Sequence, residues 1–211
     1  MKGFLKSSIG KKLFMSITGL FLITFLLVHL TANLFMFGGR EAYNSAVEFM
    51  EKNPVIQIMQ PILALGFLLH IVYSIMLSIQ NMKARGSNKY AKVDQSNSST
   101  WASRNMLVLG IFVGSFLVLH LTDFFLPMKT SEVKDVFDLV TKRFGLWYIS
   151  IPYIIGIIAL GIHLHHAFWS AFQTIGLSND LWRKRLTVLG DIFAVVIAVG
   201  YSIIALYFLI F

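Results

Sequence analysis

Six histidines are the residues of this chain best suited by type and position to chemistry. They are His29, His70, His120, His163, His165 and His166. All six lie inside long apolar segments, and the polar connections between these segments contain none. An ionisable side chain is costly inside a bilayer, so a histidine there is a candidate functional residue by default. A neutral imidazole is also a common metal ligand.

Four of these histidines lie at matching depths, because each follows the first residue of its own apolar segment by 15 or 16 positions. The count is 16 for His29, 16 for His70, 15 for His120 and 16 for His163. At the helical rise, each lies about 22–24 Å from the point where its helix enters the membrane. Successive helices run in opposite directions. We therefore expect His29 and His120 to share one level, and His70 and His163 to share another.

Two histidines from facing helices match the two axial ligands of a six-coordinate b-type haem. With both axial positions filled by protein, the expected task of the iron is electron transfer and not oxygen chemistry. The sequence therefore predicts two haem b groups at two depths, which together would form an electron path across the bilayer.

Other interpretations of the histidines fit less well. A single membrane histidine is often only hydrogen-bonded to a neighbouring helix, but four at paired depths are harder to explain in this way. A transporter or channel with a histidine-lined path would usually place carboxylates in the spans, and only Asp123 and Asp191 come close, near helix ends. A metal transporter would also be expected to use Cys, Asp or Glu. Spacing alone leaves the fourth ligand open, since His163 and His166 share a helix face while His165 points away.

The elements that must position these residues are five apolar segments. The chain has 211 residues, of which 56% are hydrophobic and 13% charged, a composition too apolar for a soluble domain. Each segment is long enough to cross a bilayer as a helix. They cover residues 13–37, 54–81, 105–126, 147–173 and 186–210. We therefore predict an all-α integral membrane bundle, with residues 1–211 forming a single transmembrane domain. Residues 131–140 are patterned like a short amphipathic helix on the membrane surface.

The basic residues predict the orientation. The N-terminal segment and the second and fourth connections hold 12 of the 18 lysines and arginines, and most acidic residues lie on the opposite side. The positive-inside rule then places the N-terminus in the cytoplasm and the C-terminus outside. His29 and His120 become the outer pair, and His70 and His163 the inner pair. Because the basic residues are divided among short loops, we expect contact with anionic lipid and no nucleic-acid binding.

The chain contains no cysteine. Disulfides, covalent c-type haem attachment and cysteine-ligated iron–sulfur clusters are therefore excluded on this chain. Any such centre would belong to a partner subunit.

Several local motifs resemble one known family, and they extend over nearly the whole chain. They are Val28-His29-Leu30-Thr31-Ala32-Asn33-Leu34-Phe35, Gly39-Arg40-Glu41-Ala42-Tyr43-Asn44-Ser45-Ala46, Leu69-His70-Ile71-Val72-Tyr73, Leu119-His120, and His163 followed by Trp169-Ser170. Together they resemble the cytochrome b558 membrane-anchor subunit of succinate dehydrogenases and fumarate reductases, of the dihaem, five-helix type. In that family the fourth ligand precedes the Trp-Ser pair by six residues. The resemblance thus selects His163 over His165 and His166.

The resemblance also implies a function and partners. A flavoprotein subunit and an iron–sulfur subunit would sit on the cytoplasmic face, and electrons would pass between succinate or fumarate and a membrane quinone, usually menaquinone. The location would be the bacterial cytoplasmic membrane. A quinone site near the outer haem needs a proton acceptor, and the candidates are Glu41, Glu51 and Asp123. The alternative function is a cytochrome b anchor for another dehydrogenase, such as a hydrogenase or formate dehydrogenase.

Overall fold

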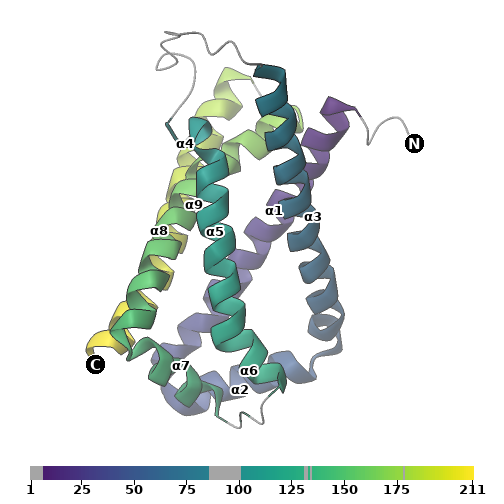
Figure 1. Ribbon diagram of the computed structural model, residues 1–211. Coiled ribbons are helices and arrows are strands. Elements are labelled where there is room, and N and C mark those ends of the chain that lie inside the picture. The colour runs from purple at the N-terminus through teal and green to yellow at the C-terminus, as the bar shows by residue number, and fades with distance from the viewer. Residues whose placement is uncertain (1–6, 86–100, 131–132, 134, 178) are drawn as a thin grey trace.

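The computed structural model describes residues 7–85, 101–130, 133, 135–177 and 179–211, and these contain helices but no strand. Five long helical segments run up and down to form a bundle (Figure 1). They are α1 (Ser8–Leu34), α3 (Pro54–Arg85), α5 (Met106–His120) with its continuation, α8 (Trp147–Thr174) and α9 (Asp180–Ile210). All five are long and apolar enough to cross a membrane. The predicted five-helix bundle is confirmed.

Two of the helices begin earlier than the apolar segments, because polar caps fix their first turns. Ser7 accepts a hydrogen bond from the Gly10 amide at 3.0 Å, so α1 begins at Ser8 and not at residue 13. Asn179 accepts one from the Trp182 amide at 2.9 Å, so α9 begins at Asp180 and not at residue 186. Capping side chains of this kind satisfy amides that have no partner inside the helix.

The third span is not a single regular helix. After α5, a turn of π-helix, η2 (Leu121–Phe125), leads into α6 (Leu126–Thr130), so the whole span runs from Met106 to Thr130. One-turn π-helices inside longer helices are often found at functional sites. Here the turn follows His120 directly, and it contains Asp123.

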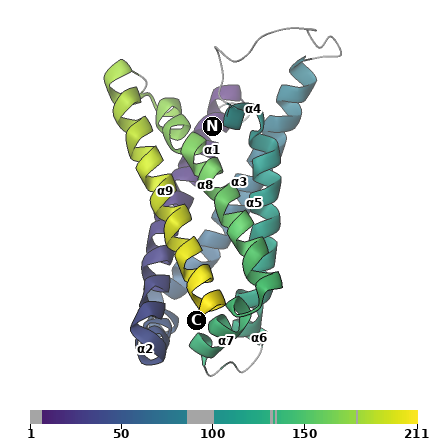
Figure 2. The same ribbon diagram turned by 90° about the vertical axis from the view of Figure 1, so that its left-hand side faces the viewer.

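Helix α8 is at the centre of the bundle and α3 at its edge. Helix α8 packs against α9, α5 and α1, whereas α3 packs mainly against α1 (Figure 2). In the most apolar window of each helix, 44% of the α8 residues are buried but only 6% of those in α3. The four candidate ligands are therefore held by one central helix, one peripheral helix and the two helices α1 and α5.

Short helices cover the end of the bundle where the C-terminus lies (Figure 1). Helix α1 passes through a 3-10 turn, η1 (Phe35–Gly38), into α2 (Gly39–Lys52), an amphipathic helix between the first two spans that was not predicted. The expected surface helix over 131–140 is α7 (Val136–Phe144), since Asp135 caps its first turn; residues 131, 132 and 134 lie outside the described part. Helix α4 (Trp101–Arg104) lies at the opposite end. We call the end that carries α2 and α7 the outer end.

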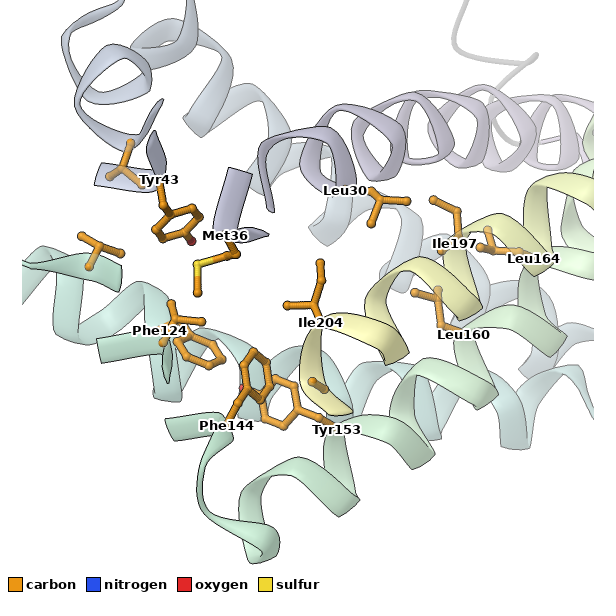
Figure 3. Packing of buried hydrophobic residues seen from close by; sticks show 14 of the residues in the cluster. Leu30, Met36, Tyr43, Phe124, Phe144, Tyr153, Leu160, Leu164, Ile197 and Ile204 are labelled. Atoms are coloured by element: carbon orange, nitrogen blue, oxygen red, sulfur yellow. The ribbon is translucent and has the colours of Figure 1, made fainter. Parts of the chain in front are cut away.

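Helices α2 and α7 are joined by polar contacts. The Asn44 side chain donates to Asp135 and accepts from the Phe137 amide, each at 3.0 Å, and Arg40 forms an ion pair with Asp135. An apolar cluster extends from this cap into the space between α1, α8 and α9 (Figure 3). Met36 and Ile197 are almost completely buried in it. The outer end is thus the closely packed part of the molecule.

Candidate haem site

The structure places His29 of α1 beside His120 of α5. Their ring centroids are 5.6 Å apart, and the ring planes make an angle of 80°. A metal–nitrogen bond of about 2 Å puts an imidazole centroid about 3 Å from the metal, so two ligands on opposite sides would be about 6 Å apart. The observed separation is close to that value. The two histidines expected at one level thus lie together.

Aromatic side chains surround this outer pair. Phe25 stacks on His29, with centroids 5.2 Å apart and planes 15° apart, and Tyr201 lies 5.9 Å from the same ring. Phe116, Phe124 and Tyr153 lie around His120. An apolar shell of this kind excludes water and lowers the local dielectric constant, and both influence the reduction potential of a metal centre.

The two histidines expected at the other level lie on α3 and α8. His70 of α3 lies 3.2 Å from the Thr18 hydroxyl of α1. The His163 Nδ1 atom is buried and has no hydrogen-bond partner among the described residues. Along α1, Thr18 precedes His29 by 11 residues, so the two levels are about 16 Å apart at the helical rise.

The two other histidines of α8 have different surroundings. His165 Nδ1 lies 2.6 Å from Asp191 Oδ1 on α9, and both side chains are about half exposed. His166 is half-buried. His165 therefore faces α9 and not the inner pair.

Asp123 is the acidic candidate that the structure brings to the outer pair. Its carboxylate accepts a hydrogen bond from the Tyr153 hydroxyl at 3.1 Å and lies 3.8 Å from the Arg143 guanidinium. The side chain is 17% exposed, so a water molecule or ligand can still reach it. Glu41 and Glu51 lie on α2 with exposed side chains. Sequence reasoning did not find Tyr153, because no pattern marked a residue 30 positions from Asp123 as its partner.

The described residues fit haem as the bound group. The outer imidazoles have nearly the required separation, and a buried His163 nitrogen has no hydrogen-bond partner among the described residues. A Cβ atom added at Gly110 or Gly114 of α5 would meet nothing within 4 Å, so a flat macrocycle could approach that face of the helix. A Cβ atom added at Gly66 would instead meet the Phe21 side chain, and one added at Gly156 would meet the Phe116 side chain. No group of three or more His, Cys, Asp or Glu side chains in the described part could hold a metal ion, whereas a haem takes only two axial ligands from the protein.

Comparison with known proteins gives a curated relative. Over 164 residues, the chain is 24% identical to the succinate dehydrogenase cytochrome b558 subunit of Bacillus subtilis (strain 168). The chain is a distant relative of that subunit. The match covers 77% of this chain and 77% of the cytochrome b558 subunit, so the resemblance predicted from the histidine motifs is confirmed. No family model and no solved structure matches the chain. The similarity to cytochrome b558 and the five spans agree in describing a multi-pass membrane protein.

Proposed function

We propose that this chain is the dihaem cytochrome b membrane subunit of a succinate:quinone oxidoreductase. The observation that carries the proposal is the outer pair. His29 and His120 lie on different helices, and the distance between their ring centroids is close to that expected for two axial ligands. The similarity to a succinate dehydrogenase cytochrome b558 subunit supports it independently. His70 and His163 would hold the second haem.

Two bound haems would supply reversible one-electron transfer at two levels of the membrane. The residues of the chain have three tasks. The four histidines would hold the two haems, the aromatic shell keeps water from the outer pair, and the helices fix the distance between the levels. Because the two levels are about 16 Å apart along α1, two haems would divide electron transfer across the membrane into shorter steps.

Asp123 is the residue that we propose for proton exchange with a quinone. Reduction of a quinone takes up protons and oxidation of a quinol releases them, so a quinone site near the outer haem needs a group that can both accept and donate a proton. Asp123 is partly exposed and is held by Tyr153 and Arg143 beside His120. Glu41 and Glu51 are weaker candidates, because their exposed positions on α2 give them no contact with the outer pair among those described. Menaquinone is the quinone proposed from the resemblance.

The partners that we propose are a flavoprotein subunit and an iron–sulfur subunit. They would bind on the cytoplasmic side, at the end opposite α2 and α7. That end carries the basic residues Lys11, Lys12 and Arg183–Arg185 on the described helices. The location that we propose is the bacterial cytoplasmic membrane, with the N-terminus inside.

Haem content and ligand substitutions test the function. The complex, purified through this chain, is expected to show two b-type haems per chain in a reduced-minus-oxidised spectrum, together with flavin and iron–sulfur centres. His29→Ala and His120→Ala should each remove the same haem, and His70→Ala and His163→Ala the other. His166→Ala is the control on α8 and should retain both.

Three results would contradict the proposal. Absence of haem from the wild-type complex would exclude a cytochrome. If His29→Ala removed the haem that depends on His70, the assignment of the pairs would be wrong. Haem with partner subunits that contain no flavin would indicate a different dehydrogenase.

A further inference from the structure

Thr18 of α1 lies directly against His70 of α3. Its Oγ1 atom is 3.2 Å from His70 Nδ1, and the side chain is only 8% exposed. It is one of few polar residues buried in the described part of the bundle. Because α3 packs mainly against α1, this contact forms part of the interface that holds α3 in place.

The hydrogen bonds of Thr18 indicate which atom donates to which. A hydroxyl has a single hydrogen to donate and two lone pairs that accept. Oγ1 lies 3.1 Å from the Phe14 carbonyl and 3.0 Å from the Met15 carbonyl of the same helix. Helical threonines commonly donate to these preceding carbonyls. The hydrogen is thus engaged within α1, and a lone pair of Oγ1 faces His70.

That arrangement selects one tautomer of His70. Nδ1 carries the proton and donates it to Thr18 Oγ1, so Nε2 keeps an unshared lone pair. A neutral imidazole binds a metal through the nitrogen without a proton, and the hydrogen bond made by the other nitrogen sets this choice. The geometry therefore leaves Nε2 as the ligating atom.

Gly19 completes the contact surface for the His70 ring. A Cβ atom at this position would lie 3.4 Å from His70 Cε1 and 3.9 Å from Nδ1. Even a methyl group would touch the edge of the imidazole, and a larger side chain would displace it. Thr18 thus holds the His70 ring from one side through a hydrogen bond, and Gly19 leaves the space that the edge of the ring occupies.

The other candidate ligands have different partners. His163 Nδ1 has none in the described part of the chain. His29 Nδ1 lies 3.4 Å from the Asn33 amide nitrogen, on its own helix, and that nitrogen also donates to the His29 carbonyl at 2.8 Å. Thr18 contacts the His70 ring of the inner pair and neither histidine of the outer pair.

We propose that Thr18 is a positioning residue for the inner haem, which fixes the tautomer and orientation of His70 and lowers the reduction potential of that haem alone. The inference rests on the proposed function. A hydrogen bond from Nδ1–H makes the imidazole a stronger electron donor. Stronger donation favours the ferric over the ferrous state, and the potential falls.

The test is a redox titration of the complete complex, followed by the absorbance of each haem. Thr18→Val keeps the shape of the side chain but removes the acceptor, and is expected to raise the potential of the inner haem only. Thr18→Ser keeps the hydroxyl and should restore a value near wild type. Thr24→Val is the matched control, since Thr24 is an exposed residue of α1 whose hydroxyl donates to Leu20. It should leave both potentials unchanged.

Three results would overturn the inference. They are an unchanged inner potential in Thr18→Val, equal shifts of both haems, and a Thr18→Ser complex that behaves like Thr18→Val. If Thr18→Val fails to assemble, Thr18→Ala provides the same comparison with Thr18→Ser. If the wild-type complex contains two haems and the Thr18 variants leave the potential of the inner haem unchanged, only this inference is refuted. A wild-type complex without haem refutes the proposed function.

Discussion

Single polar side chains determine how the helices face one another. The Tyr201 hydroxyl of α9 donates to the Leu26 carbonyl of α1 at 3.0 Å, and Tyr153 of α8 donates to Asp123 of η2. Inside a bilayer few water molecules are available to replace such a partner, so each bond favours one rotation of its helix. The histidine pairs depend on these rotations as well as on depth.

Tyr153→Phe removes only the hydroxyl that donates to Asp123, and so tests the role of the Asp123 site. The ring would still pack against Phe116, Phe124 and His120, but Asp123 would lose its hydroxyl partner. We expect haem content to be unchanged and quinone reduction by succinate to fall roughly tenfold or more, since positioned proton-transfer groups contribute about 100-fold or more. The measurement compares the rate with quinone to the rate with a soluble dye that accepts electrons before the membrane subunit.

The control for this variant is Tyr148→Phe, because Tyr148 is on the same helix but is 56% exposed. It should leave both rates unchanged. Equal losses with quinone and with the dye would show that Tyr153→Phe damages the complex as a whole, and the proton-transfer role would be rejected.

Counting along the sequence could predict the depth of the histidines but not their neighbours. His29 and His120 follow from position alone, because the rise per residue of a helix is constant. The Thr18–His70 contact joins residues 52 positions apart, and it depends on how α1 and α3 are rotated. Apolar residues surround most of each helix in a membrane, so hydrophobic periodicity gives little information about rotation.

Among the elements, the interface of α5 and α8 is the one closest to the outer pair. Gly156 of α8 faces Phe116 of α5, and an added Cβ atom would overlap the Phe116 side chain, whose own Cβ is 2.8 Å away. Phe116 in turn contacts His120. We expect Gly156→Ala to destabilise the fold by about 1–3 kcal/mol, the usual cost of overpacking, and to perturb the outer haem.

Denaturation of the complex in detergent and the spectrum of each haem would measure these two effects. Ser115→Ala is the control, because Ser115 precedes Phe116 on α5 but has an exposed side chain. A Gly156→Ala variant with wild-type stability and an unchanged outer haem would show that the α5–α8 packing does not position His120.

The long helices were predictable as elements, and the short ones were less so. A run of about 20 apolar residues has few structures available in a bilayer, so the five spans follow from composition. Helix α2 was missed because it buries only Tyr43 and Val47, one turn apart, among charged residues typical of a connection. Its position depends on the contacts of Asn44 and Arg40 with residues more than 90 positions away.

In the whole molecule, the two candidate sites belong to differently packed regions. The outer pair lies beside the apolar cluster of α1, α8 and α9 and under the cap of α2 and α7, whereas the inner pair includes His70 of the exposed helix α3. No sequence pattern indicated which helix would be central, since all five are similarly apolar. In the part of the chain that the structure describes, α3 has many exposed apolar side chains and packs mainly against α1.

The topology of the whole chain can be tested with single cysteines, because the natural sequence contains none. Ser45 lies on α2, between the first and second spans, and Asp180 begins α9, between the fourth and fifth; both are exposed. With the N-terminus in the cytoplasm, as the positive-inside rule predicts, a membrane-impermeant maleimide should label Ser45→Cys in intact cells and Asp180→Cys only in inverted vesicles. Ser8→Cys should behave like Asp180→Cys. The reverse pattern would invert the orientation and place the partner subunits at the α2–α7 end, and labelling of Ser45→Cys and Asp180→Cys from the same side would contradict the five-span bundle itself.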